Sequence, residues 1–137
     1  MGYIINNMYS KTTNGIKVTV TPYFLDDQSS PQDDHFVWAY QVNIKNLGNT
    51  TMRLSQRNWV IIDANGKILN VQGDGVVGEF PTLQPGESFE YTSGTPLKTN
   101  NGIMQGFYLM SKDDGEQLKI DIPTFYLDSP YNKKNLH

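Results

Sequence analysis

A glycine-rich segment has the spacing in this sequence that most resembles a ligand-binding motif. Gly73, Gly75 and Gly78 match the pattern GxGxxG and follow a predicted strand. In dinucleotide-binding folds these glycines lead into a helix whose N-terminal amides hold a pyrophosphate. Here two prolines and a glycine follow at 81–86, which forbids the helix, and no acidic residue stands about twenty positions on to hold a ribose. The segment therefore does not predict a Rossmann site.

A weaker form of the same idea stays open. Backbone amides around the glycines could form an anion-binding concavity. The candidate anion or ligand turn comprises Gly73, Asp74, Gly75, Gly78 and Glu79. Against it, Asp74 and Glu79 bring negative charge, no Lys or Arg lies within the motif, and a tight connection that needs positive φ explains the glycines equally well.

Metal ligation has few possible donors. The chain has no cysteine and two histidines, of which His137 is the last residue. A hard-cation site would have to draw on one acidic loop: Asp26, Asp27, Asp33, Asp34 and His35. The spacing matches no EF-hand, and a flexible Ser-Pro segment positions ligands poorly. We interpret this segment as a solvated loop and predict neither a metal site nor a cofactor.

The residues needed for catalysis are also missing. A Ser or Thr nucleophile needs a base, and His35 stands alone beside the acidic loop. Asp63, Asp113 and Asp114 fall in predicted hairpin turns rather than facing each other across a cleft. Arg57 beside Trp59 could be a functional pair, although such an arginine is commonly structural. We predict that the protein is not an enzyme.

Composition narrows the class of partner. The net charge is -3, and only two of the 11 basic residues are arginines, so a concentrated basic face for nucleic acid is not expected. The N-terminus lacks an apolar signal segment, and no stretch is long and apolar enough to span a membrane. These features predict one cytoplasmic domain over residues 1–137, loosely ordered at 1–14 and 131–137.

Aromatic residues are the remaining signal. There are more of them than the predicted core faces can absorb, and exposed aromatic positions suit peptide or protein partners. The candidate interaction surface comprises Tyr23, Phe80 and Tyr126.

The elements that must position these residues are strands. From Phe36 to Asn46 every second residue is apolar, which places one set of side chains on one face of a strand. Shorter alternating runs are predicted at 16–21, 58–63, 67–71, 88–92, 103–110 and 118–122, separated by turn signals. Pro123 removes a backbone donor, so the last strand is expected to lie at an edge or to bend. About seven antiparallel strands predict an all-β immunoglobulin-like or fibronectin type III-like sandwich.

Several segments carry a family resemblance: 36–40, 44–48, 57–63, 71–79, 83–94, 102–108 and 122–125. The most specific are Gly-Asp-Gly-Val-Val-Gly-Glu at 73–79 and Pro-Gly-Glu-Ser-Phe-Glu-Tyr-Thr-Ser-Gly at 85–94. In these segments, which extend over nearly the whole chain after the first dozen residues, the sequence resembles the ApaG family. Phe80 departs from the polar residue usual in that family, which weakens the case for a polar ligand at the turn.

The resemblance implies a fibronectin type III-like sandwich, a bacterial cytosolic origin, and a genetic link to Co²⁺ resistance and Mg²⁺ efflux. It also implies an operon shared with a diadenosine tetraphosphate hydrolase. Similar domains occur in some F-box proteins, where a protein-interaction role is supposed. We therefore expect a non-catalytic module that binds another protein and influences cation efflux indirectly. The alternative is a sensor that binds a nucleotide, polyphosphate or Mg²⁺–phosphate at the glycine-rich turn, with weak binding of a divalent cation or polyphosphate.

Overall fold

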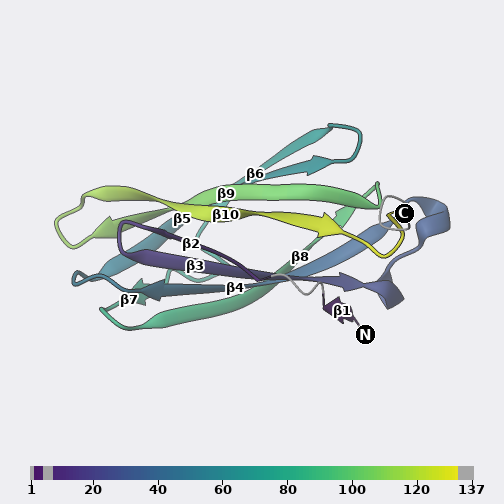
Figure 1. The fold of residues 1–137 in the computed structure, drawn as a ribbon. Coiled ribbons are helices and arrows are strands. Elements are labelled where there is room, and N and C mark those ends of the chain that lie inside the picture. Colours follow the sequence, from purple (N-terminus) through teal and green to yellow (C-terminus); the bar gives the residue numbers. More distant parts are fainter. Residues whose placement is uncertain (1, 5–7, 133–137) are drawn as a thin grey trace.

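The computed structural model describes the backbone of residues 2–4 and all of residues 8–132. These residues form two antiparallel sheets packed face to face, as Figure 1 shows. The first sheet contains β1 (Gly2–Ile4), β2 (Tyr9–Thr13), β3 (Ile16–Leu25), β4 (Phe36–Asn46) and β8 (Ser88–Leu97). The second contains β5 (Met52–Asp63), β6 (Ile68–Asp74), β7 (Thr82–Leu83), β9 (Asn101–Lys112) and β10 (Gln117–Asp128). The described helical segments are two 3₁₀ turns, η1 (Asp26–Gln28) and η2 (Pro31–Asp33).

The predicted sandwich is confirmed. Residues with an even number in β3 and β4 are buried along one face, and this alternation continues from Phe36 to Asn46. The seven predicted strands correspond to β3, β4, β5, β6, β8, β9 and β10, most of them longer than expected. The described residues add three short strands, β1, β2 and β7, whose few residues give no periodic signal.

Residues 9–13, within the segment 1–14 that we expect to be loosely ordered, pair with β3 along the whole of β2. The sequence of β2 shows no alternation of apolar and polar residues, because most of its side chains are exposed. The predicted loose order at 133–137 and 5–7 falls outside the described residues.

One lateral side of the sandwich is closed. Strand β10 is an edge strand, and its register shifts between Ile122 and Phe125, so Pro123 lies both at an edge and at a bend. The Thr13 hydroxyl accepts a hydrogen bond of 3.3 Å from the backbone amide of Asp121. Lys11 forms an ion pair of 3.0 Å with the Asp121 carboxylate. These contacts join β2 of the first sheet to β10 of the second, which lie side by side in Figure 1.

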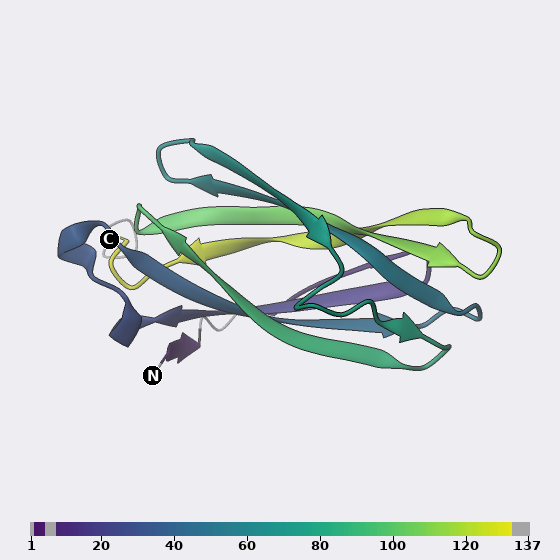
Figure 2. The ribbon, with the colours of Figure 1, turned by 180° about the vertical axis from the view of Figure 1, so that it is seen from behind.

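The opposite lateral side is open. Its edges are β8 in the first sheet and β6 in the second, and in the described part of the chain each pairs with one neighbour. Figure 2 shows the hairpin of β5 and β6 turning away from the sandwich. Ile68 and Leu69 on β6 are consequently 59% and 56% exposed, although both are large and apolar. The open side is therefore where the interior of the sandwich can be reached.

Candidate functional site

Two adjoining cavities follow the open side of the sandwich. Their volumes are about 270 Å³ and 400 Å³, and both are lined by Ile61 and Leu69. We call them together the edge groove. Its lining residues, in chain order, are His35, Tyr40, Arg57, Trp59, Ile61, Asp63, Lys67, Ile68, Leu69, Val71, Val77, Tyr91, Ser93, Gly94, Thr95, Pro96, Leu97 and Lys98.

A bulge in β5 sets which of its side chains enter the groove. Met52 and Leu54 are buried at even positions, but the register against β9 shifts between Leu54 and Gln56. The extra residue, Ser55, reverses the phase of the strand, because side chains alternate across a sheet. Arg57 and Trp59 therefore face the interior, and Arg57 lies directly opposite Tyr108 of β9.

The wall from the first sheet is more polar. Tyr40 and Ser93 are directly opposed on β4 and β8. Along β8, alternate residues from Tyr91 through Ser93 and Thr95 share the inner face, and all three line the groove. This wall places hydroxyl groups opposite the apolar side chains of Trp59 and Ile61.

Arg57 is held at one end of the groove. Its Nη1 donates to the carbonyl oxygens of Asp74 at 2.8 Å and Gly75 at 3.0 Å. The guanidinium lies against Gly73, where an added Cβ would come within 2.6 Å of Nη2. The guanidinium places a positive charge at this end of the groove.

Three tyrosines surround this end. The hydroxyls of Tyr91 and Tyr108 hydrogen-bond to each other across the two sheets. Burial raises the pKa of Tyr40, of Tyr91 and of Tyr108, and the Arg57 charge only partly offsets the rise in each pKa. All three hydroxyls are therefore neutral at physiological pH and can act as hydrogen-bonding groups rather than as bases.

The other end of the groove is apolar with a cationic rim. Ile68, Leu69, Pro96 and Leu97 line it, and Lys67 and Lys98 lie beside them. The only carboxylate among the described lining residues is that of Asp63. Its Oδ1 accepts hydrogen bonds of 2.9 Å from the backbone amides of Asn65 and Lys67. The groove thus carries more positive than negative charge in a chain whose net charge is -3.

The glycine-rich turn uses several of its amides internally. Val76 and Glu79 exchange two backbone hydrogen bonds of 2.9 Å around Val77 and Gly78, both of which have positive φ. The Gly75 amide donates to the carbonyl of Ser55 at 3.0 Å. Three amides that an anion would need are therefore occupied by the chain. The structure does bring a cation to the turn, Arg57, which the sequence motif lacks.

The acidic loop does not gather its side chains. Within residues 8–132 no three His, Asp or Glu side chains are arranged to hold a metal ion. Asp26 accepts a hydrogen bond from Tyr131 at 2.9 Å, and Asp33 accepts one from Ser30 at 2.6 Å. Asp27, Asp34 and His35 are exposed around the two 3₁₀ turns.

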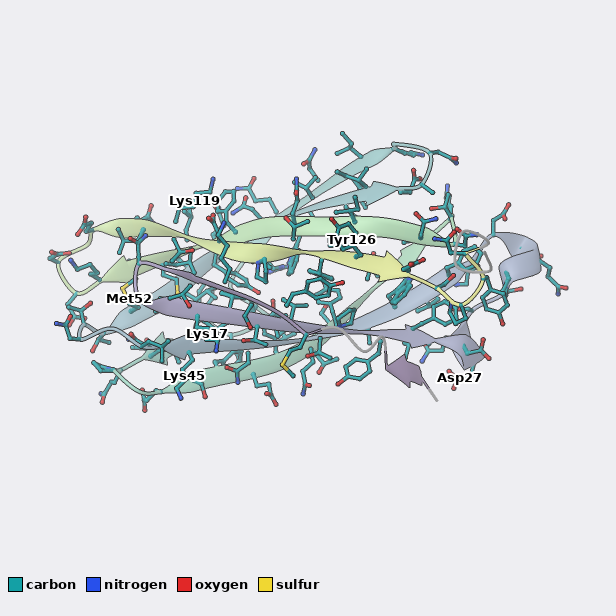
Figure 3. The ribbon with its side chains drawn as sticks, viewed as in Figure 1. Lys17, Asp27, Lys45, Met52, Lys119 and Tyr126 are labelled. Atoms are coloured by element: carbon teal, nitrogen blue, oxygen red, sulfur yellow. The ribbon has the colours of Figure 1, made fainter. Side chains whose placement is uncertain are left out.

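The three aromatic residues predicted as an interaction surface lie on separate elements. Tyr23 is half-buried on β3, and Phe80, between β6 and β7, packs under Arg53 at 5.3 Å. Tyr126, labelled beside β10 in Figure 3, is 53% exposed and contacts Tyr9. Phe80 and Tyr126 thus contact Arg53 and Tyr9, respectively.

The sequence reasoning missed the edge groove. The sequence places Ile68 and Leu69 in the strand predicted at 67–71, and it singles out Arg57 only beside Trp59. One signal was available: two adjacent apolar residues directly after a hairpin turn put one side chain on each face, which is unusual for an edge strand.

Comparisons with known proteins agree with this fold. The family profile described as the ApaG domain matches residues 26–112. A Protein ApaG from Paramagnetospirillum magneticum is 58% identical over 130 residues, which is 95% of this chain and 100% of the relative. A Protein ApaG from Parvibaculum lavamentivorans is 54% identical with the same coverage. The crystal structure of an ApaA protein from Bordetella pertussis is 39% identical, has a TM-score of 0.82, and is matched over 90% of this chain and 98% of its own.

Proposed function

The chain belongs to the ApaG family, and we propose that it is a non-catalytic binding module whose edge groove holds an extended segment of another protein. The observation that carries this proposal is the open side of the sandwich. There, Leu69 stays more than half exposed opposite the buried Ile61, and the neighbouring Ile68, which also lines the groove, is more than half exposed as well. Exposed apolar side chains that rim a groove are typical of protein-binding sites.

The two edge strands fit an extended occupant. An edge strand presents unpaired backbone groups, and a peptide can add to it while its alternate side chains fill pockets. The groove follows β5 from Arg57 to Asp63, which at about 3.3 Å per residue is roughly 20 Å. It would hold on the order of six extended residues.

Charge specifies the chemistry of that segment. Arg57, Lys67 and Lys98 line the groove, and the Asp63 carboxylate already accepts two amides. Electrostatic complementarity favours a partner with carboxylates flanking its apolar residues. The partner is therefore a protein with an apolar and acidic segment, and a cytoplasmic one if the chain is located there. The link to Co²⁺ resistance and Mg²⁺ efflux implied by the family resemblance would then act through this partner.

Selection of peptides against the purified chain tests the proposal. A random peptide library displayed with free carboxyl termini should yield ligands rich in apolar and acidic residues. Leu69→Asp should abolish their binding, because it places a charge in the apolar end of the groove. Leu47→Asp is the matched control, because Leu47 is 54% exposed but lies outside the groove. If no ligand is obtained, or if the ligands bind Leu69→Asp as tightly as the unchanged chain, the proposal is wrong.

A phosphorylated ligand at the glycine-rich turn is the second candidate. The position of Arg57 against Gly73, Asp74 and Gly75 favours it, and the internal use of three turn amides counts against it. Inorganic pyrophosphate titrated with Mg²⁺ should shift the NMR amide signals of 73–79 saturably if this candidate is right. Unchanged signals at millimolar pyrophosphate would eliminate it.

A further inference from the structure

We propose that the bound segment is a protein C-terminus and that its terminal carboxylate pairs with Arg57. This inference rests on the proposed function, because it specifies how the segment lies in the edge groove. It assigns the polar end of the groove as a carboxylate subsite and the apolar end as the site for the residues that precede the terminus.

The groove ends at Arg57. Beyond this residue the chain crosses between β6 and β7, and Val76 in that crossing is fully buried in the core. Val77 lines the same cavity as Arg57. A continuous peptide would have to pass this crossing, whereas a chain terminus can stop in front of it.

The guanidinium is fixed and still has donors available to a ligand. In the described part of the chain its hydrogen bonds engage Nη1 only, with two carbonyl oxygens. A guanidinium carries five N–H donors. The contact with Gly73 keeps its plane in place while the side chain lines the cavity. A preorganised arginine of this kind binds carboxylates more strongly than a mobile surface cation, because little ordering is needed on binding.

Hydroxyl groups complete the subsite. Tyr40 and Ser93 are opposed across β4 and β8 and line the cavity with Arg57. The Ser93 side chain hydrogen-bonds to Tyr40, and the Tyr40 hydroxyl can donate to a carboxylate oxygen. No carboxylate of the chain lines this cavity among the described residues. The next side chains along the groove are Trp59 and Val71, which are directly opposed on β5 and β6. The last residue of the partner should therefore be apolar.

The hydrogen bond between Tyr91 and Tyr108 also supports a carboxylate subsite at Arg57. Tyr91 also lines the cavity, and its hydroxyl is paired with that of Tyr108, so it fixes the depth of the subsite. Burial keeps the pKa of Tyr91 above its ordinary value, so no phenolate competes for Arg57 at neutral pH.

The test changes the peptide rather than the protein. A groove-binding peptide from the selection is synthesised as the free acid and as the C-terminal amide, and both affinities are measured by calorimetry. The amide should bind about tenfold or more weakly, because it loses a charge-assisted pair. In Arg57→Lys, which keeps the charge but lacks the planar fork, the difference between acid and amide should shrink severalfold. Leu47→Asp should leave it unchanged.

The outcomes separate this inference from the proposed function. Equal affinities of acid and amide for the unchanged chain, with binding still lost in Leu69→Asp, would overturn the carboxylate subsite and leave the groove as the binding site. If the peptides bind Leu69→Asp as tightly as the unchanged chain, both the carboxylate subsite and the groove as the binding site would be overturned. A peptide extended by two residues beyond the selected terminus should bind as weakly as the amide, and full affinity for that extended peptide would also contradict the inference.

Discussion

The hydroxyl of Tyr91 on β8 hydrogen-bonds to the hydroxyl of Tyr108 on β9, and this bond joins the two sheets through the interior. Tyr108 is fully buried and Tyr91 nearly so. Arg57 lies directly opposite Tyr108, so the bond sits at the polar end of the edge groove. Toward its tip, the hairpin of β5 and β6 turns away from the rest of the sandwich (Figure 2).

Removing one hydroxyl of this pair should destabilise the fold. In Tyr91→Phe the Tyr108 hydroxyl is left buried without its partner, which should cost about 1–3 kcal/mol of the free energy of unfolding. Replacing both tyrosines by Phe should cost less than the sum of the single changes. Urea unfolding of the four proteins gives this comparison as a double-mutant cycle. Strictly additive costs would show that the bond contributes nothing.

Stability should also fall at high pH. Burial raises the folded-state pKa of Tyr91 and Tyr108 above the value of an unfolded tyrosine, about 10. The neutral forms are favoured by folding, so their contribution is complete below about pH 10 and is lost as the pH rises through the raised pKa values. The midpoint of urea unfolding should therefore fall progressively as the pH rises above about 10. The Tyr91→Phe/Tyr108→Phe double variant controls for lysine titration, and an equal drop there would contradict the assignment.

Gly73 should be needed for the placement of Arg57. In Gly73→Ala the new Cβ would meet the guanidinium, the flexible end of its side chain, and displace it from the carbonyls of Asp74 and Gly75. The expected loss is about 1–2 kcal/mol of stability together with weaker peptide binding. Gly48→Ala is the control, because its Cβ would come no nearer than 3.4 Å to Asn46. Unchanged peptide binding in Gly73→Ala would separate Arg57 from recognition.

Ile68 and Leu69 should matter for binding and little for stability. Both side chains are more than half exposed, so Ile68→Thr with Leu69→Thr should change the free energy of unfolding by less than about 1 kcal/mol. Affinity for a groove-binding peptide should fall at least tenfold, as the occupant loses apolar contacts. Ile61→Ala, which empties a buried position, should instead cost about 2–5 kcal/mol of stability. A large stability loss in the double variant would mean that β6 is packed rather than open.

The sequence predicts most of the sandwich because its long strands alternate regularly. Phe36 to Asn46 is buried at every second residue, as the pattern predicts, and Pro123 lies at a bent edge as expected. Periodicity cannot locate the bulge at Ser55, because the four residues between Leu54 and Trp59 are all polar and do not show where the phase changes. The short strands β1, β2 and β7 likewise offer too few residues for a pattern.

The groove could not be predicted for a related reason. An apolar run such as Ile68 and Leu69 predicts burial, and only the tertiary divergence of β6 leaves it exposed. The approach of Arg57 to the glycine-rich turn depends on the phase change in β5 and on the pairing of Arg57 with Gly73. Neither the register nor the bulge is encoded in the spacing of the glycines.

An NMR titration of the ¹⁵N-labelled chain with a selected peptide tests the central claim most directly. The account predicts saturable shifts of the Trp59 indole N–H and of the amides at 57–61, 69–71 and 91–97, with Leu47 and Tyr126 unchanged. These shifts should vanish in Leu69→Asp and persist in Leu47→Asp. Saturable shifts that instead cluster around Tyr23 and Tyr126, with the groove amides unmoved, would contradict the claim that the edge groove is the binding site.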